Sequence, residues 1–278
     1  MTVYPLTFSI LGFEITGFGL MMMAGFLVAG WVMQLELRRR RLAADYAADI
    51  LVGAVIGGIL GARLWYMALH GGPLLSRGGL VWYGGFLGGL VAVLGTGWLK
   101  GVPARFTLEL TAPALPLGHA LGRTGCFLVQ DDYGLPTSLP WGMRFPDGEP
   151  PTTAAQLARW GADIPAGTPP DTVLAVHPTQ LYEVAALLFL FWLLWRWRRH
   201  EHAVGWLFAC YLIGVGIERF LVEFVRAKDD RVLAGFTLAQ ATSVVIVLAG
   251  IGLLTMWRRK DALVVKPEGV FAPRGEKS

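Results

Sequence analysis

The sequence predicts an all-α, polytopic membrane protein with about seven transmembrane helices. Of its 278 residues, 54% are hydrophobic and only 16% are charged, whereas charged residues make up about a quarter of an ordinary soluble domain. The mean hydropathy is +0.52. The apolar residues also occur in blocks of roughly 18 or more, which is the length that crosses a bilayer as a helix.

The first three apolar blocks follow one another with short polar segments between them. The first covers residues 16–37 and ends at four consecutive arginines, residues 38–41. The second covers residues 47–69, and the third covers residues 80–99. Each block has the length that one transmembrane helix needs, so we expect three spans here.

The fourth block, residues 106–129, carries helix-interrupting residues, namely Pro113, Pro116, Gly118 and Gly122. Proline removes a backbone donor from a helix interior, and glycine weakens the helix. We therefore expect a broken helix here. The last three spans are expected at residues 180–197, 204–222 and 236–257.

The positions of Lys and Arg predict the orientation, because short cytoplasmic loops carry an excess of these residues. With seven spans, the basic clusters after spans one, three, five and seven lie on one side; they occupy residues 38–41, 100–105, 196–199 and 258–260. We therefore expect the N-terminus outside and the C-terminus inside. The loop after span six, with Arg226, Lys228 and Arg231, fits the rule less well.

The domain organisation expected from this pattern is simple. Residues 1–278 form a single transmembrane domain with no clear internal repeat. Residues 130–176, rich in Pro, Gly and acidic residues, form an extracytoplasmic loop segment within it. Residues 261–278 are expected to be a flexible cytoplasmic tail.

Two classes of partner are not expected. The basic clusters flank apolar blocks and do not form a stripe interleaved with aromatic residues, so nucleic-acid binding is not predicted. The two cysteines, Cys126 and Cys210, make neither a disulfide framework nor a CxxC metal site. We therefore expect no metal.

Charged residues within the apolar spans identify candidate functional positions, because a charge in the bilayer needs a partner or a water-filled site. Arg123 lies between Gly122 and Gly125. Glycine allows a close backbone approach, and the arginine fork matches phosphate oxygens. Pairing of this arginine with Asp131 or Asp132 is the structural alternative. His119, four residues earlier, is either a functional group or a hydrogen-bonded core histidine.

Three further segments break the apolar pattern in the same way. Arg63 lies near the end of the second span, where it either binds a ligand or snorkels to the interface. In residues 177–183, Thr179 and Glu183 fit a helix-capping arrangement, whereas His177 and Tyr182 are less easily explained by structure alone. The other positions in this group are Glu218, Arg219, Glu223 and Arg226, near the end of the sixth span.

Arg219 and Glu223 in the sixth span are expected to pair, because they are four residues apart and share a helix face. Such a pair inside an apolar bilayer has to face the bundle interior, either as a structural ion pair or as part of a site. In the predicted topology, four arginines gather near the outer side; they are Arg63, Arg123, Arg219 and Arg226. This grouping predicts an anionic ligand, and a phospholipid head group is the natural candidate.

Several motifs in order carry a resemblance to a known family. Residues 122–134 read GRTGCFLVQDDYG, residues 177–183 read HPTQLYE, and residues 217–226 read IERFLVEFVR. These motifs, with GFGLMMMAGF, GARLWY and WYGGFLGG before them, resemble those of the bacterial prolipoprotein diacylglyceryl transferases. The resemblance extends from about residue 10 to residue 257.

The resemblance implies an enzyme with seven spans in the bacterial cytoplasmic (inner) membrane and its N-terminus outside. It implies transfer of a diacylglyceryl group from phosphatidylglycerol to the lipobox cysteine thiol of a preprolipoprotein. The products are a thioether and glycerol phosphate. The implied partners are phosphatidylglycerol, preprolipoprotein signal peptides and membrane lipid, and no metal or organic cofactor is implied.

The family's functional positions are carried over residue by residue. Arg123 matches the arginine that binds phosphatidylglycerol, and Arg219 and Glu223 match an essential charged pair. Gly134 closes the signature, and Asp131 stands where the family usually has glutamate. The chain departs from the family at three positions, where it has Phe18 for tyrosine, Tyr83 for histidine and Cys126 for asparagine.

These residues give a mechanistic hypothesis, in which a thiol displaces phosphate from the glycerol carbon. Arg123 and Arg219 hold the phosphate and offset its charge as it leaves, while Glu223 orients Arg219 or relays a proton. The proton-transfer candidates are Tyr83, His119 and Asp131. The expected substrate-binding residues are Arg63, Arg123, Gly134, His177, Tyr182 and Arg226.

Two other functions stay open at the level of sequence. A catalytically altered paralogue would bind lipid or signal peptide without transfer, and the changes at Phe18 and Tyr83 keep this alternative open. A lipid transporter would also place arginines in the membrane, but it usually has paired broken helices or internal symmetry, which the sequence does not display.

Overall fold

The computed structural model describes residues 1–10, 13–73, 81–227, 231–233, 236–257, 263–265 and 271–273. The predicted fold class is confirmed in its coarser form, because the described chain is mostly helical. The helices are α1 Gly17–Arg39, α2 Asp45–His70, α3 Trp82–Leu99, α4 Ala104–Thr111, α5 Ala114–Leu128, α6 Ala154–Arg159, α7 Thr179–Trp197, α8 Trp206–Val222 and α9 Leu238–Met256.

Each predicted apolar block coincides with a long helix or, in the fourth block, with a pair of helices. The break in that block was predicted, and it falls between Thr111, the last residue of α4, and Ala114, the first residue of α5. Pro113 occupies the N-cap position of α5, where its missing N–H leaves no helix acceptor unpaired. The helix α6 and the short strands were not predicted.

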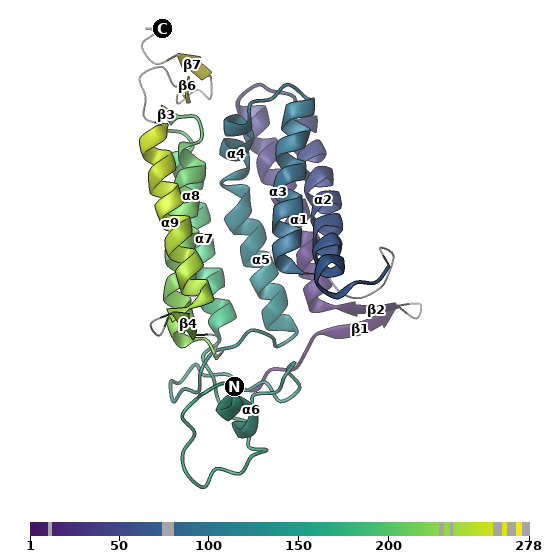
Figure 1. Ribbon diagram of the computed structural model, residues 1–278, viewed down its shortest axis with the longest axis vertical. Coiled ribbons are helices and arrows are strands. Elements are labelled where there is room, and N and C mark those ends of the chain that lie inside the picture. The colour runs from purple at the N-terminus through teal and green to yellow at the C-terminus, as the bar shows by residue number, and fades with distance from the viewer. Residues whose placement is uncertain are drawn as a thin grey trace.

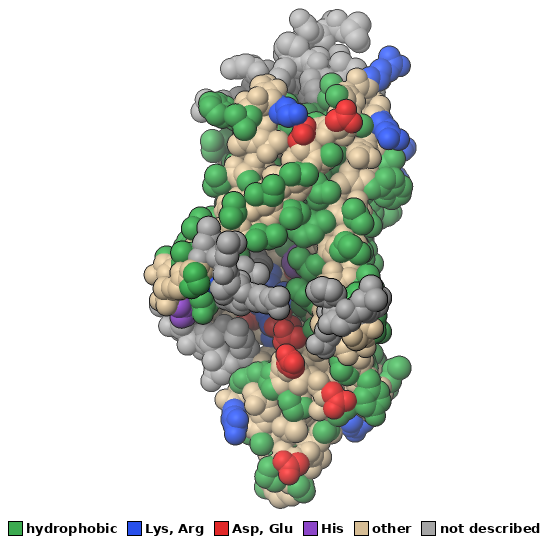
Figure 2. All heavy atoms as spheres, turned by 90° about the vertical axis from the view of Figure 1, so that its right-hand side faces the viewer, with side chains coloured by type: hydrophobic (Ala, Val, Ile, Leu, Met, Phe, Trp, Pro, Cys, Tyr) green, Lys and Arg blue, Asp and Glu red, His purple; other side chains and the backbone are tan. Residues whose placement is uncertain are grey.

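The membrane character of the chain is confirmed by its apolar helices. Within the described ranges, α1, α2 and α9 are long and apolar enough to cross a membrane, and residues 83–99 form a shorter apolar helix. Large apolar side chains face outward along the bundle, for example Trp31, Val91 and Trp192. Figure 2 shows hydrophobic side chains over much of the upper half of one face. Such an apolar outer surface is suited to a lipid environment.

The long helices run roughly parallel to the long axis of the molecule (Figure 1). The N-terminus, α6 and the segment before α7 lie at one end, and the strands β6 and β7 lie at the other. The pair α2 and α3 packs very closely, because a methyl group on Gly61 or Gly88 would collide with backbone of the other helix. Small residues allow such an approach between apolar helices.

Short strands add to the helices at both ends of the bundle. The antiparallel pair β1 Thr7–Ile10 and β2 Phe13–Thr16 pairs Thr7 with Thr16 and leads into α1. The pair β4 Arg231–Leu233 and β5 Phe236–Thr237 precedes α9. At the other end, a three-stranded antiparallel sheet contains β3 His202–Ala203, β6 Leu263–Val265 and β7 Phe271–Pro273.

Some sequence-based expectations fall on residues that the structure does not describe. Lys228 and the basic cluster at residues 258–260 lie outside the described residues. The same holds for most of the tail expected at residues 261–278, of which only β6 and β7 are described.

The segment between α5 and α7 has a small apolar core of its own. Tyr133, Phe145, Leu157 and Val176 are buried together. The Tyr133 ring stacks on that of Phe145 with centroids 5.8 Å apart. Because this core sits directly below α5 and α7 (Figure 1), it holds the ends of both helices in a defined position.

Candidate active site

The end of α5 brings Arg123 against two carboxylates. Its Nη1 lies 2.8 Å from Oδ2 of Asp132, in the loop that follows α5. Its Nε lies 2.7 Å from Oε2 of Glu183, in the first two turns of α7. The Glu183 side chain is 3% exposed, so the Arg123 guanidinium is held on its inner side by a buried carboxylate.

Helix α8 presents a second arginine to the same carboxylate. Nη1 of Arg219 lies 3.6 Å from Oε1 of Glu183. Nη2 of Arg219 lies 2.7 Å from Oε2 of Glu223, four residues later. The predicted pair of Arg219 and Glu223 is therefore formed. Glu183 joins Arg123 to Arg219 through its two oxygens.

A third arginine closes the network. Arg226 forms an ion pair with Asp132 Oδ1, and its Nη1 lies 3.9 Å from Oε2 of Glu223. The six side chains alternate in sign around a closed circuit, which we call the charge ring; its members are Arg123, Glu183, Arg219, Glu223, Arg226 and Asp132. Three positive and three negative groups make the ring neutral overall.

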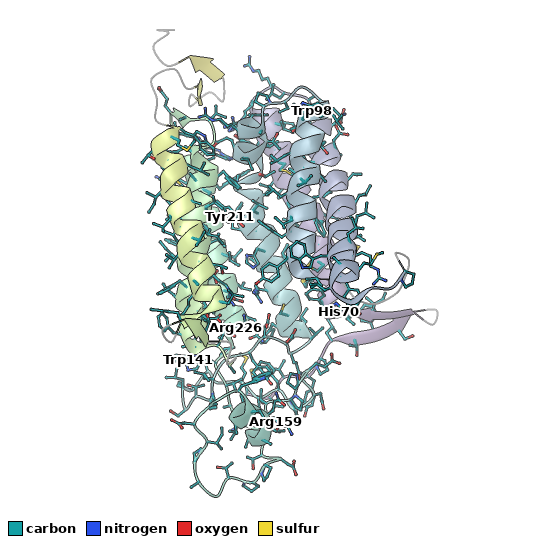
Figure 3. The ribbon with its side chains drawn as sticks, in the orientation of Figure 1. His70, Trp98, Trp141, Arg159, Tyr211 and Arg226 are labelled. Carbon is teal, nitrogen blue, oxygen red and sulfur yellow. The ribbon has the colours of Figure 1, made fainter. Side chains whose placement is uncertain are left out.

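The members of the charge ring differ in their access to solvent. Glu183 and Glu223 are nearly fully buried, whereas the Asp132 side chain is 33% exposed. Figure 3 shows Arg226 near the lower end of the helices, close to the segment that carries Trp141. Figure 2 shows one face hollowed about midway along its length, with basic and histidine side chains visible inside the hollow and acidic ones at its lower edge.

The loop after α5 has an unusual backbone that places Asp132 in the ring. Gln130 and Asp132 both have φ of 63°, a left-handed conformation that Asp and Asn tolerate better than most residues. The Thr179 hydroxyl donates to the Asp132 carbonyl at 2.7 Å. The Gln180 side chain donates to the Asp131 carbonyl at 2.6 Å. The loop is thus attached to the start of α7 by side-chain hydrogen bonds.

These contacts correct the capping interpretation of residues 177–183. The N-cap of α7 is Pro178, and no side chain caps it. Thr179 instead fixes the loop, and Glu183 holds Arg123 and Arg219. The capping interpretation is therefore wrong for both residues.

The two neighbouring aspartates differ in their electrostatics. Burial by itself would raise the pKa of Asp132, but the charges of Arg226 and Arg123 together outweigh it and hold this pKa below its ordinary value. Burial and the adjacent Asp132 charge raise the pKa of Asp131. The Asp131 carboxylate accepts from the Asp132 backbone N–H at 2.7 Å. The carboxylate that pairs with the arginines is that of Asp132.

Gly134 lies where three backbone segments meet. Its N–H donates to the His177 carbonyl at 2.8 Å, and it forms a β-bridge with Arg226. A Cβ placed on Gly134 would lie 2.5 Å from the Val225 carbonyl oxygen and 2.8 Å from the His177 Cβ. A residue with a side chain at this position has no room.

We expect Gly134→Ala to destabilise the protein by about 1–3 kcal/mol, the range found for overpacked sites. The collision involves backbone atoms, so it forces apart the loop and the end of α8. The measurement is the thermal unfolding midpoint in detergent, with Gly252→Ala as a comparison, because a Cβ added to Gly252 would meet no other atom within 4 Å. An unchanged midpoint for Gly134→Ala would contradict the described packing.

The predicted pair of His177 and Tyr182 is also brought together. Nδ1 of His177 lies 3.2 Å from the Tyr182 hydroxyl, which accepts from Nε1 of Trp141 at 2.8 Å. Partial burial lowers the pKa of His177. These side chains lie beside Gly134 at the outer edge of the charge ring, since the His177 carbonyl binds the Gly134 N–H.

Three further residues that the sequence predicts for the site, His119, Arg63 and Tyr83, are not members of the charge ring. His119 is four residues before Arg123 on α5, so it lies one turn further into the bundle. Arg63 donates to the Pro73 carbonyl and lies over the Tyr66 ring at 5.3 Å. Tyr83 is at the start of α3 and half exposed. Arg63 and Tyr83 belong to the closely packed pair α2 and α3, separate from the helices α5, α7 and α8 that carry the charge ring.

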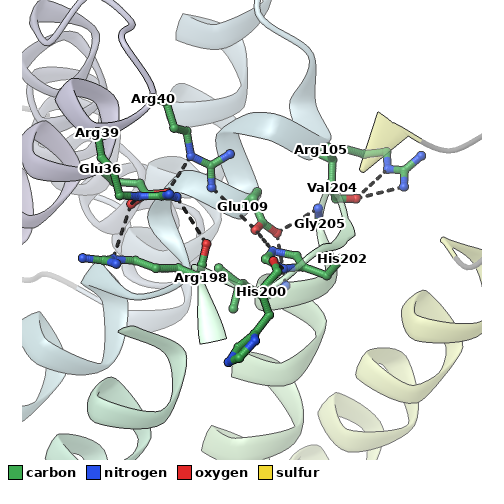
Figure 4. Close-up of polar contacts among 11 residues, drawn as sticks. Glu36, Arg39, Arg40, Arg105, Glu109, Arg198, His200, His202, Val204 and Gly205 are labelled. Carbon is green, nitrogen blue, oxygen red and sulfur yellow. Dashed lines mark hydrogen bonds and ion pairs between the residues drawn. The ribbon is translucent and has the colours of Figure 1, made fainter. Parts of the chain in front are cut away.

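A second charged cluster lies at the opposite end of the bundle (Figure 4). Glu36 accepts hydrogen bonds from Arg39 at 2.8 Å and Arg40 at 2.6 Å, and Arg198 lies 3.4 Å from it. Glu109 accepts from the backbone N–H of Gly205 at 2.9 Å, at the start of α8. Arg39, Arg40 and Arg198 belong to the basic clusters that predict the membrane orientation. Through Glu36, these arginines also join α1 to the end of α7.

The described residues contain no group of three or more His, Cys, Asp and Glu side chains that could hold a metal ion. Arg123, Glu183 and Arg219 come from α5, α7 and α8, whereas Glu223 and Arg226 belong to the 3₁₀ turn η1 Glu223–Val225 and its C-cap, and Asp132 to the loop after α5. The three arginines of this ring present guanidinium donors to a ligand rich in oxygen atoms.

Comparison with known proteins decides the family. The family model described as prolipoprotein diacylglyceryl transferase matches residues 5–256. The chain belongs to the prolipoprotein diacylglyceryl transferase family. The resemblance seen in the motifs is thereby confirmed.

Individual relatives agree with this family. The phosphatidylglycerol–prolipoprotein diacylglyceryl transferase of Burkholderia mallei is 35% identical, over 90% of this chain and 92% of the relative. The protein of the same name from Burkholderia thailandensis is 35% identical, over 86% and 89%. That from Pseudoalteromonas atlantica is 29% identical, over 93% and 91%.

Within this diacylglyceryl transferase fold, the three departures from the family motifs lie in different surroundings. Cys126 is one turn after Arg123, with its Sγ 4.0 Å from Nη1 of the guanidinium. Phe18 packs against Gly125, whose added Cβ would lie 3.1 Å from the Phe18 Cα. Cys126 is therefore a departure from the family motif that contacts the charge ring.

Sequence reasoning underestimated two members of the charge ring. Glu183 was assigned to capping, and Asp132 was named only as an alternative partner of Arg123. A carboxylate in the second turn of an apolar helix is itself a signal, because it has to meet a cation if it is buried. That signal identifies Glu183 as a ring residue, but it does not name the partners.

Proposed function

We propose that this chain transfers a diacylglyceryl group from phosphatidylglycerol to the lipobox cysteine thiol of preprolipoproteins. The reaction forms a thioether and releases glycerol phosphate. The observation that carries the proposal is the charge ring, because it gathers three arginines beside the motifs of the transferase family. The relatives from Burkholderia mallei and Pseudoalteromonas atlantica are named for the same donor and acceptor.

The proposal includes a location and an orientation. The protein spans the bacterial cytoplasmic membrane seven times as one catalytic domain, with the N-terminus and residues 130–176 outside and the C-terminus inside. Two observations support this arrangement. The N-terminus and β7, the last described strand, lie at opposite ends of the bundle (Figure 1). The basic clusters at residues 38–41 and 196–199 lie at the end opposite to the charge ring.

The ring geometry suggests how the donor phosphate binds. The ring is neutral, so an anionic phosphate must replace one of its carboxylates. Asp132 is the most exposed of the three acids, whereas Glu183 and Glu223 are buried behind the arginines. We propose that the phosphate takes the place of the Asp132 carboxylate between Arg123 and Arg226.

In this arrangement the buried acids keep a role. Glu183 and Glu223 hold the guanidinium groups in position, so that little reorganisation is needed when charge develops on the leaving phosphate. Arg123 and Arg226 then contact that charge directly, and Arg219, whose charge also acts on the position of Asp132, adds to the effect. Exclusion of water by the bundle strengthens the interaction. His177, Tyr182, Gly134, Arg226 and Arg63 are proposed to contact the donor or the peptide.

Complementation tests the proposed function. A strain depleted of its own diacylglyceryl transferase would express this chain together with a reporter prolipoprotein. We expect a reporter mass increased by one diacylglyceryl group, because the thiol of its lipobox is alkylated. A reporter with serine in place of that cysteine is the matched control and should stay unmodified.

An unmodified cysteine reporter, with the chain present in the membrane at the normal level, would reject the transferase function. Binding of phosphatidylglycerol without transfer would then identify a catalytically altered paralogue. Movement of lipid across vesicles would instead identify a transporter.

A further inference from the structure

One buried acid near the charge ring has no partner. Glu218, on α8 directly before Arg219, is 7% exposed. Among the described residues, no group forms a hydrogen bond or an ion pair with either oxygen of its carboxylate, and both oxygens are buried. An ionised carboxylate in this state is costly. The residue therefore has to exchange a proton or meet a ligand.

The other buried acids of the described chain make the contrast clear. Each has at least one cationic partner or a set of backbone donors; they are Glu36, Glu109, Glu183 and Glu223. Buried polar groups in proteins are nearly always hydrogen-bonded, and exceptions call for an explanation. Packing does not supply one for Glu218, because an apolar residue would fill the same space without the penalty.

Glu218 nevertheless belongs electrostatically to the site. The charges of Glu183, Arg123 and Arg219 all act on it. Along the chain it lies between Tyr211, midway along the bundle, and Arg226, which follows α8 near the lower end (Figure 3). Since the charge ring is already neutral, Glu218 adds a fourth acid to three arginines.

The structure assigns to Glu218, on the basis of the proposed function, the role of accepting the proton of the lipobox cysteine thiol. The sulfur attacks the glycerol carbon that bears the phosphate, and the S–H proton passes to a Glu218 oxygen. The S–C bond forms while the C–O bond breaks. The electron pair of that bond leaves on the phosphate oxygen, which lies within the charge ring beside Arg123 and Arg226.

The proton is then returned. Cleavage of the phosphodiester leaves glycerol phosphate with one more negative charge than the donor lipid had. This phosphate takes the proton from Glu218, so the carboxylate is restored for the next turnover. A free thiol has a pKa of about 8.5, so an acceptor within the site raises the fraction of thiolate available for attack.

Neighbouring groups are less suited to this role. Glu183 and Glu223 are committed to arginines, and protonation of either would leave a buried guanidinium unpaired. His119 would become a second cation one turn from Arg123, whereas Glu218 becomes neutral when it accepts a proton. Asp131 lies in the loop beyond the end of α5, with its carboxylate bound to the Asp132 N–H.

The test compares two nucleophiles in purified enzyme with phosphatidylglycerol and a labelled lipobox peptide. We expect Glu218→Gln to slow transfer to the cysteine peptide by about 100-fold, the lower range for loss of general acid–base catalysis. The KM for phosphatidylglycerol should stay unchanged. A selenocysteine peptide should be modified at nearly the wild-type rate, because a selenol is ionised at neutral pH without a base.

Controls separate chemistry from folding. Glu218→Asp keeps a carboxylate and should retain part of the activity. Glu201→Gln makes the same change on an exposed side chain after α7 and should behave as wild type. The pH dependence of these rates also reflects the groups that interact electrostatically with Glu218. These are Tyr211 and Arg219 on α8, Arg123 on α5 and Glu183 on α7.

Three outcomes overturn the assignment. A wild-type rate for Glu218→Gln with the cysteine peptide would leave Glu218 a structural residue. An equal decrease in the rate of transfer to both peptides would mean that the substitution disturbs the site as a whole and does not act on proton transfer. If the wild-type enzyme modified neither peptide, the proposed function itself would be rejected.

Discussion

Arg123→Ala is expected to lower the rate of thioether formation by about 10³-fold, the upper range for removing one charge-stabilising donor. Two effects act together. The leaving phosphate loses the guanidinium that offsets its charge, and the buried Glu183 loses the partner 2.7 Å from its Oε2. The measurement is the single-turnover rate with saturating phosphatidylglycerol, in membranes matched for protein level.

Arg123→Lys separates charge from geometry. An ammonium group keeps the charge but presents no planar fork, so it cannot hold Asp132 and Glu183 through two nitrogens as the guanidinium does. We expect a smaller loss than with alanine, though still a clear one. Arg159→Ala, which removes an exposed side chain of α6 far from the ring (Figure 3), is the matched control. Full activity of Arg123→Ala would remove the charge ring from the mechanism.

Much of the fold was predictable because apolar blocks of helical length report directly on the helices. Pro113 marked the break between α4 and α5. The strands were missed because most of them are only two to four residues long, as in β1 and β3. So short a segment shows no alternation of polar and apolar residues from which a strand could be predicted.

The candidate site was predictable in composition but not in pairing. Arg123, Arg219 and Arg226 were identified because each is a charge beside an apolar span. The choice of Asp132 over Asp131 depends on a left-handed turn at φ 63° and on bonds from residues nearly fifty positions away. Local spacing does not contain that information, so both aspartates looked equivalent in the sequence.

Glu183 illustrates how a local rule can hide a distant contact. At the start of a helix, an acidic residue after a threonine satisfies the usual capping pattern. In the structure its oxygens instead contact Arg123 and Arg219, from α5 and α8. A buried ion pair outweighs a surface cap energetically, because a buried charge left alone is far more costly than an unsatisfied helix end.

Glu183→Ala is accordingly expected to destabilise the protein by about 3–5 kcal/mol, the range for breaking a buried ion pair by removing one partner. The substitution leaves Arg123 and Arg219 facing each other without the carboxylate between them. Glu183→Gln keeps the size and one acceptor oxygen, so we expect a smaller loss. Chemical denaturation in detergent measures both. A wild-type stability for Glu183→Ala would contradict the described ring.

Activity distinguishes positioning by Glu183 from stability alone. If Glu183 acts by holding Arg123, its removal should lower kcat strongly in the wild-type background and much less when Arg123 is already alanine. Two side chains in contact are expected to be non-additive in this way. Additive losses would mean that Glu183 supports the bundle independently of Arg123. Because Glu183 contacts both arginines, the same cycle with Arg219→Ala measures how far the ring acts as one unit.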